Sequence, residues 1–275
     1  MEYPVRVVTT GCFQEGDIYM QKEELQPLPS DVVEKVEVVW GQELERNPNL
    51  KPGPLLVARS VDVRVRSLHL RCGVSNYKNF MGTTHETVAP GIAEEHRHRA
   101  IGFLAVTITS DNCFLLGVRS PKIDWGNLRH VVPAGRLRPD EQDPFTGIRT
   151  EFKEELGLLP GEIQDLVCVG VVADETWGRL NYEFCFYATT PLTAWQVIQR
   201  ARGAKSADEH CQLEPFPWSP EFVRNLLLAD TNGFVPTGWA GIALCLWHSH
   251  GPNSFPLWTP VHRTYTEHMG RRLYA

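Results

Sequence analysis

Residues 132–158 constrain this chain more than any other stretch, because they place three carboxylates on one face of a short predicted helix. Glu151, Glu154 and Glu155 stand at i, i+3 and i+4, positions that neighbour one another on a helix surface. Like charges at this spacing repel, so we expect a cation to lie against them. Hard divalent cations such as Mg²⁺ take oxygen ligands from carboxylates and substrate phosphates. The stretch therefore predicts metal-assisted cleavage of a phosphate anhydride.

The helix that carries these carboxylates has clear ends. Asp143 suits the N-cap, Pro144 suits the first helical position, and Gly157 can end the helix. Gly147 lies inside the helix, where glycine is about 1 kcal/mol less favourable than alanine. Apolar residues at three- and four-residue spacing predict the buried side, namely Phe145, Ile148, Phe152 and Leu156. The alternative is a solvated acidic face, but the glycine turn before the helix, at Ala134-Gly135, favours a binding site.

Composition excludes several classes of protein. The formal net charge of −6 argues against nucleic acid as the main partner, because contacts to phosphates need a basic surface. No apolar run approaches the roughly 20 residues that a membrane helix needs, and the first residues lack the apolar core of a signal peptide. The seven cysteines contain no CxxC pair and fit a reducing compartment. We therefore expect a cytoplasmic protein with no membrane partner.

The chain divides into two predicted domains. Residues 1–98 are expected to form a smaller α+β domain, with a helix over 30–45 and a strand over 61–72. The polar segment 82–99 reads as a linker or lid. Residues 99–275 form the second domain, which includes a C-terminal tail after Gly251.

The second domain alternates strands and helices. Strands are expected at 100–109, 113–119, 166–173 and 180–188. The acidic helix lies between the second and third of them, and a strongly apolar helix over 239–247 closes the series. This order predicts a mixed sheet between helices, an α/β/α sandwich.

The same stretch resembles the motif of the Nudix hydrolases, G-x5-E-x7-R-E-U-x-E-E-x-G-U, where U is apolar. Gly135 and Glu141 match its front, and residues 151–158 match its back without a gap. One inserted residue separates the halves, so the motif arginine falls on Thr150. Arg149 precedes it and points about 100° away around the helix. The resemblance implies the Nudix-type α/β/α sandwich and hydrolysis of a nucleoside diphosphate derivative.

A narrower resemblance touches both predicted domains. Residues 70–83, 174–188 and 236–247 are similar to the UDP-glucose/UDP-galactose pyrophosphatases of animals within this superfamily. Those enzymes also lack the usual arginine and carry an N-terminal domain. The resemblance implies Mg²⁺-dependent hydrolysis of UDP-glucose or UDP-galactose to UMP and a hexose 1-phosphate.

The resemblance also implies roles for the motif residues. Glu151 and Glu155 would be the principal ligands of Mg²⁺ or Mn²⁺, and Glu154 a ligand or the general base. The backbone carbonyl of Ala134 or Gly135 would complete the coordination. A metal-bound water with a lowered pKa would then supply hydroxide near neutral pH.

Other side chains are candidates with open alternatives. Glu183 lies on a predicted strand, as an extra metal ligand or base, or as a surface carboxylate on an edge strand. Glu175 is a weaker candidate for a contact with the substrate. Arg119 and Arg129 can hold a phosphate, since guanidinium pairs bidentately with such oxygens, or can simply be solvated.

The N-terminal part contributes Tyr77, Phe80 and Thr83 to the narrower resemblance. An aromatic ring there can stack on uracil and the Thr hydroxyl can read its edge, or these residues can belong to the core. ADP-ribose or another nucleotide sugar is an alternative substrate. A non-catalytic protein that binds a nucleotide sugar is the alternative function.

Overall fold

The computed structural model describes residues 5–176 and 180–255, so part of the segment 174–188 and most of the tail after Gly251 lie outside it. The strands are β1 (Val5–Phe13), β2 (Ile18–Lys22), β3 (Pro54–Arg64), β4 (Ser67–Asn76), β5 (Arg99–Ile108), β6 (Cys113–Arg119), β7 (Arg129–Val131), β8 (Ala134–Arg136), β9 (Gln164–Asp174), β10 (Asn181–Thr189) and β11 (His210–Pro217). The helices are α1 (Ser30–Arg46), α2 (Tyr77–Thr84), α3 (Pro144–Leu156), α4 (Ala194–Ala201), α5 (Pro220–Ala229) and α6 (Pro236–His250).

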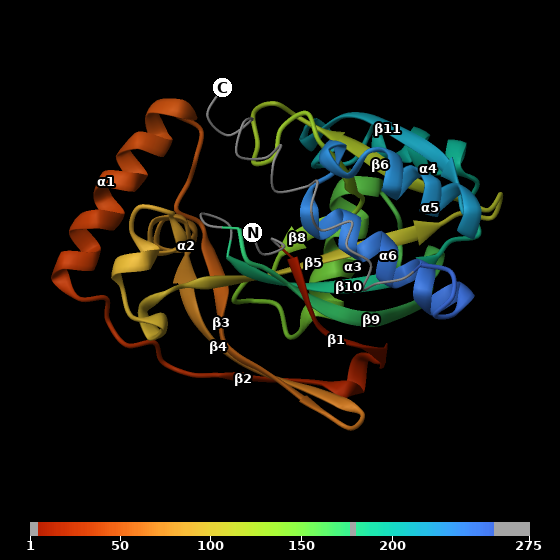
Figure 1. Cartoon of the computed structure of the whole chain (residues 1–275). Coiled ribbons are helices and arrows are strands. Elements are labelled where there is room, and N and C mark those ends of the chain that lie inside the picture. Colours follow the sequence, from red (N-terminus) through yellow and green to blue (C-terminus); the bar gives the residue numbers. More distant parts are fainter. Residues whose placement is uncertain (1–4, 177–179, 256–275) are drawn as a thin grey trace.

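The strands form a mixed sheet with helices on both faces (Figure 1). Its main path follows the order β1-β9-β10-β5-β3-β4-β2, while β8 and β6 also pair with β5. β10 runs parallel to β5, whereas β9 pairs antiparallel with β10. Successive side chains of β5 enter different cores: Phe103 packs with the buried face of α3, and Leu104 packs with α6. The predicted α/β/α sandwich is confirmed.

Strands from the first 98 residues belong to this same sheet. Val5 on β1 pairs with Asp174 on β9, and Val57 on β3 pairs with Ala100 on β5. The predicted domain boundary falls where β5 begins, at Arg99. The division into two domains stays a prediction. Hydrogen bonds between β1 and β9, and between β3 and β5, join the two parts across the predicted boundary.

Two expectations for the N-terminal part were wrong in detail. The residues 61–72, where one strand was expected, cover the end of β3, the hairpin turn at 65–66 and much of β4, and Val65 in the turn is 99% exposed. The segment 82–99, expected as a linker or lid, contains two short 3₁₀ turns, and Val88, Ala89 and Ile92, in and beside the first of them, are buried.

Helix α3 forms as its sequence predicts. The Asp143 side chain accepts a hydrogen bond from the Thr146 backbone N–H at 2.7 Å, so it caps the helix as expected. Gly157 ends it in the left-handed region with a φ of 65°. The predicted apolar stripe is fully buried against the sheet. Both ends of the helix that carries the carboxylates are therefore fixed by local contacts.

Gly147 allows α3 to approach the sheet closely. A Cβ atom placed on Gly147 would lie 2.4 Å from Cε1 of Phe103 on β5, and that ring is completely buried. The glycine therefore has a packing role that outweighs its low helix propensity. Any larger residue would lift α3, and the carboxylates it carries, away from the strand.

We expect Gly147→Ala to destabilise the protein by about 1–3 kcal/mol, because overpacking a buried contact outweighs a propensity gain of about 1 kcal/mol. Gly41→Ala in α1 is the matched control, since nothing lies within 4 Å of its Cβ position. That control is expected to gain up to about 1 kcal/mol. Urea unfolding of both variants checks the opposite signs, and a Gly147→Ala variant as stable as wild type would contradict the packing role.

No helix among residues 5–176 and 180–255 is long and apolar enough to cross a membrane. All seven cysteines are free. Cys12 and Cys211 are exposed, while Cys72, Cys168 and Cys185 are among the buried ones. The cytoplasmic location stays a prediction.

His98 is a buried histidine beneath the N-terminal part of the sheet. Its Nδ1 lies 2.7 Å from the Ser75 hydroxyl, and its backbone N–H donates to the hydroxyl of Thr83. Burial, aided by the charges of Arg59 and His96, lowers the pKa of His98 from 6.5 to about 4. The unfolded chain therefore takes up this proton at a higher pH than the folded protein does.

Because the folded pKa is depressed, the stability that His98 contributes is lost as the pH falls from 6.5 towards 4. We expect wild type to lose about 2 kcal/mol more than His98→Gln between pH 7 and pH 5. Urea unfolding of both proteins at the two pH values measures this difference. Equal losses in the two proteins would show that His98 protonates freely in the folded state.

Candidate active site

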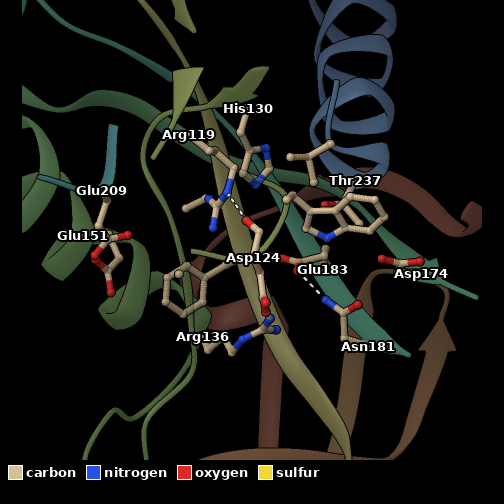
Figure 2. A pocket seen from close by; sticks show the side chains of 15 residues that line it. Arg119, Asp124, His130, Arg136, Glu151, Asp174, Asn181, Glu183, Glu209 and Thr237 are labelled. Atoms are coloured by element: carbon tan, nitrogen blue, oxygen red, sulfur yellow. Dashed lines mark hydrogen bonds and ion pairs between the residues drawn. The ribbon is translucent and has the colours of Figure 1, made fainter. Parts of the chain in front are cut away.

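A pocket of about 270 Å³ opens between the sheet and the N-terminus of α6, and charged side chains dominate its lining (Figure 2). The charged residues of the lining are Arg119, Asp124, Arg136, Glu151, Asp174, Glu183 and Glu209. Figure 2 shows Glu151 and Glu209 together, and we call this part the carboxylate end. His130, Asp174, Asn181 and Thr237 form the opposite part, the polar end. The two arginines lie between these ends.

Glu151 reaches the pocket from α3 because β8 has a glycine opposite it. A Cβ atom on Gly135 would lie 2.7 Å from the Glu151 Oε1. Burial, aided by the charges of Glu155 and Glu209, raises the pKa of Glu151 to about 8. The carboxylate is therefore crowded by like charges at the point where β8 passes closest.

Glu155 lies one turn further along α3 and is almost completely buried. Its Oε1 accepts a hydrogen bond from the backbone N–H of Ala134 at 2.9 Å, and its Oε2 lies 2.9 Å from Nε2 of His210. Burial raises its pKa to about 8. Glu155 thus joins α3, β8 and β11 just behind the pocket.

Glu154 turns away from the other two carboxylates. Its Oε1 accepts from Lys205 Nζ at 2.8 Å, and its Oε2 lies 3.9 Å from Nη1 of Arg138. It does not line the pocket in the part of the chain that the structure describes. The three carboxylates of the predicted cluster therefore divide into an inner pair and one outer member.

Glu209 joins the carboxylate end from a distant part of the chain. It ends the short 3₁₀ turn Ala207–Glu209, immediately before β11. Burial raises its pKa, and the charge of Glu155 raises it further. No sequence motif marked this residue, and β11 went unpredicted because Pro215 and Pro217 interrupt its pattern.

The donor atoms at the carboxylate end suit a hard divalent cation. Glu151, Glu155 and Glu209 offer carboxylate oxygens, and their mutual repulsion raises the pKa of Glu151 and Glu209. Among the described residues, no three His, Cys, Asp or Glu side chains already stand in the arrangement of a metal site. Binding of a cation would therefore require small movements of these side chains.

Two arginines give the pocket its positive charge. Arg119 on β6 donates from Nε to the backbone oxygen of Asp124 at 2.7 Å. The guanidinium of Arg136 on β8 lies over the ring of Phe80, 4.7 Å from its centroid, and 5.8 Å from that of Tyr77. Tyr77 in turn donates its hydroxyl hydrogen to the Asp124 carboxylate at 2.7 Å. Helix α2 therefore holds Arg136 in place.

Glu183 reaches the pocket from β10, as the sequence predicts for a residue on this strand. Its carboxylate lies on Gly102 of β5, where a Cβ atom would be 2.4 Å from Oε2. The Asn181 amide donates to its Oε1. Burial raises the pKa of Glu183 to about 7, although the Arg136 charge lowers it. This carboxylate can therefore exchange a proton near neutral pH.

The structure brings only some predicted site residues together. Gly135, Glu151, Glu183 and Arg119 line the same pocket. Tyr77 reaches it indirectly, through Asp124. Arg136, which we did not predict, is the second cation of the pocket.

Other predicted residues lie elsewhere. Arg129 pairs with Glu214 and Asp230, and Glu175 pairs with Arg6 near the edge of the sheet. Both candidates are therefore held by ion pairs outside the pocket lining. Their predicted contacts with substrate stay predictions.

Two N-terminal candidates are packed inside the protein. Phe80 and Thr83 are completely buried, and neither lines the pocket. Thr83 donates to the backbone oxygen of Asn79 at 2.7 Å, while the Phe80 ring faces Arg136. Their predicted contact with uracil stays a prediction.

The remaining motif residues support the backbone around the site. Glu141 is buried and accepts hydrogen bonds from the backbone N–H and the guanidinium of Arg138. Thr150, at the motif arginine position, donates to the backbone oxygen of Thr146. Arg149 pairs with Glu15 through both carboxylate oxygens, at 2.9 and 2.8 Å, and so points away from the pocket as predicted.

No protein-family model matches the chain, and no curated protein matches it. Among solved structures, a Nudix hydrolase from Nitrosomonas europaea is 18% identical over 55% of this chain and 89% of its own, with a TM-score of 0.37. NrtR from Shewanella oneidensis is 14% identical over 64% and 84%, with a TM-score of 0.39. An Ap4A hydrolase from C. elegans is 14% identical over 52% and 93%, with a TM-score of 0.35. All three similarities are distant, and none assigns a substrate to this chain.

We expect Gly135→Ala to displace the Glu151 carboxylate and weaken Mn²⁺ binding by at least about tenfold, as loss of a ligand's support typically does. Gly161→Ala is the control, because nothing lies within 4 Å of its Cβ position. Isothermal titration calorimetry with Mn²⁺ measures both variants. Unchanged affinity in Gly135→Ala would show that Glu151 does not hold the metal.

Proposed function

We propose that this chain is a metal-dependent pyrophosphohydrolase of nucleoside diphosphate sugars, of the Nudix type. One observation carries the proposal: a single pocket is lined by the half-buried carboxylates Glu151 and Glu209 and by the cations Arg119 and Arg136. Carboxylates that crowd together suit a divalent cation, and guanidinium groups suit phosphate oxygens. A diphosphate bound through metal and arginine satisfies both kinds of charge.

Glu151, Glu155 and Glu209 would hold Mg²⁺ or Mn²⁺, together with a backbone carbonyl of Ala134 or Gly135. When bound, such an ion polarises phosphoryl oxygens and lowers the pKa of water. We place Glu154 in a supporting role, because Lys205 already neutralises its charge. Direct coordination by Glu154 would need that ion pair to open.

The arginines bind and orient the two phosphates. Arg136 is held by the aromatic rings of α2, and Arg119 by the Asp124 carbonyl. Attack of water on one phosphorus breaks the bond to the bridging oxygen and releases one proton. Glu183, whose pKa burial raises to about 7, would accept that proton.

We propose UDP-glucose and UDP-galactose as substrates, and UMP and a hexose 1-phosphate as products. This choice rests on the resemblance of residues 70–83, 174–188 and 236–247 to enzymes of that specificity. ADP-ribose or another nucleotide sugar would use the same arginines and carboxylates. The carboxylate end determines the reaction, and the rest of the pocket selects the base and sugar.

A non-catalytic nucleotide-sugar-binding protein is the second candidate. Thr150 occupies the position of the motif arginine, and Arg149 is engaged by Glu15 instead of the carboxylates. A binding protein would keep the arginines but would not need the inner carboxylates. Turnover therefore separates the two candidates.

We expect UMP to be released from UDP-glucose and UDP-galactose only when Mg²⁺ or Mn²⁺ is present. The panel includes ADP-ribose, ADP-glucose and NADH, each with metal and with a chelator, and chromatography measures the nucleoside monophosphate. AMP from an adenine substrate would keep the reaction and reject the uridine specificity. Metal-dependent binding without any product would support the binding protein.

Glutamine variants then rank the carboxylates. Glu151→Gln and Glu155→Gln are expected to lower turnover by at least about 100-fold, because each removes negative charge that a metal needs. Glu154→Gln should lower it less, and Glu34→Gln in the exposed part of α1 is the control. A Glu154→Gln variant as inactive as Glu151→Gln would move Glu154 into the catalytic centre.

A further inference from the structure

We infer that the polar end of the pocket, formed by His130, Asp174, Asn181 and Thr237, binds the uncharged glycosyl group of the substrate. This inference rests on the proposed function and adds a location for the sugar. All four side chains line the pocket opposite Glu151 and Glu209 (Figure 2). They come from β7, β9, β10 and the first turn of α6, so the fold brings them together from distant parts of the chain.

His130 is the observation that points to a ligand. Its side chain is only 6% exposed, lines the pocket, and has a buried Nδ1 without a hydrogen-bond partner among the described residues. The ring packs on α6, where a Cβ atom at Gly238 would lie 2.3 Å from Nδ1. That nitrogen lies against Gly238 with almost no exposed surface, so a ligand hydroxyl in the pocket would meet the other atoms of the ring, which line the pocket.

The imidazole is held in its neutral form. Burial lowers the pKa of His130 well below 6.5, and the charges of Arg119, His210 and Arg136 lower it further. A neutral imidazole carries one N–H donor and one acceptor nitrogen. It therefore matches a hydroxyl group, which also donates and accepts, better than it matches a phosphate.

Asn181 and Asp174 complete this end from neighbouring strands. They are register partners on β10 and β9, and both are at least 95% buried. An amide offers donors and an acceptor, and a carboxylate accepts from hydroxyl groups. Thr237 adds a hydroxyl from α6. Four such side chains around one cavity suit a ring that carries several hydroxyls.

Charge sets the direction in which the substrate lies. Asp174 repels phosphate from the polar end, whereas Arg119 and Arg136 attract it to the middle of the pocket. The sugar then lies beyond the arginines and the scissile anhydride lies towards Glu151. The volume of about 270 Å³ is at the lower limit of ligand pockets, roughly 300–1,000 Å³, so it holds only part of a nucleotide sugar.

A nucleobase fits this end less well. Bases are usually bound by stacking on aromatic faces, and the four side chains of the polar end include no Phe, Tyr or Trp, whereas Trp125 lines the pocket from the segment between β6 and β7. We therefore place the nucleoside towards the opening of the pocket rather than at the polar end.

Binding of the separate product halves tests the inference without turnover. Calorimetry with Mg²⁺ compares α-D-glucose 1-phosphate, UMP and inorganic phosphate on wild type, Thr237→Val and His130→Leu. Thr237→Val keeps the shape of the side chain and removes only its hydroxyl. Thr190→Val is the matched control, because Thr190 is equally buried and does not line the pocket.

We expect wild type to bind glucose 1-phosphate more tightly than inorganic phosphate. Each variant should weaken glucose 1-phosphate by about tenfold, the effect of one lost hydrogen bond, and leave UMP and phosphate unchanged. If the variants weaken UMP instead, the nucleoside occupies the polar end. If they weaken nothing, or if wild type does not favour glucose 1-phosphate over phosphate, the inference is overturned.

The proposed function and the position of the sugar are tested by different measurements. Release of UMP from UDP-glucose by wild type tests the reaction, while the affinities test the position of the sugar. A protein that cleaves UDP-glucose but shows no sugar-specific effect of Thr237→Val overturns the inference alone. A protein that cleaves nothing but loses glucose 1-phosphate affinity in both variants overturns the reaction alone.

Discussion

The site depends on how closely the sheet backbone approaches buried carboxylates. Gly135 on β8 and Gly102 on β5 leave room for Glu151 and Glu183, whose oxygens would clash with a Cβ at either position. Carboxylates buried in this way are costly unless a partner compensates their charge. Burial accordingly raises the pKa of both groups, to about 8 and about 7. Burial thus disfavours the charged forms of these carboxyl groups, and a cation bound beside them would offset that cost.

Compensation comes from elements that are far apart in the sequence. His210 on β11 contacts Glu155, and Arg136 on β8 lowers the pKa of Glu183. Arg136 itself depends on Phe80 and Tyr77 in α2. The electrostatics of the pocket therefore join both halves of the chain. The N-terminal part of the chain therefore contributes to the site by holding Arg136 in place.

Local signals made α3 predictable in detail. Its cap, its stripe and its final glycine all act within a few residues, and each appears as expected at Asp143, Phe152 and Gly157. Only the class of the sheet was predictable and not the order of its strands, because the pairing of β1 with β9 joins residues that lie 155 to 169 positions apart in the sequence. A sequence pattern describes one helix or strand at a time, so it does not show which distant strand that element pairs with.

The residues of the site also divide into those that a local sequence signal predicts and those that depend on distant contacts. Glu151, Gly135 and Glu183 were predictable because a motif or a strand pattern marks them. Glu209 and Arg136 were not, since only the packing of β11 and α2 gives them a role. Glu154 shows the opposite limit: helical spacing placed it with its neighbours, but Lys205 draws it outward.

The continuous sheet has a consequence for how this protein can be divided. Hydrogen bonds from β1 and β3 cover the outer edge of β9 and one end of β5. Removing the first 98 residues would leave both strands with unpaired N–H and C=O groups, the kind of edge on which chains associate with one another. Those N-terminal strands thus act as a protective border for the strands that carry the pocket.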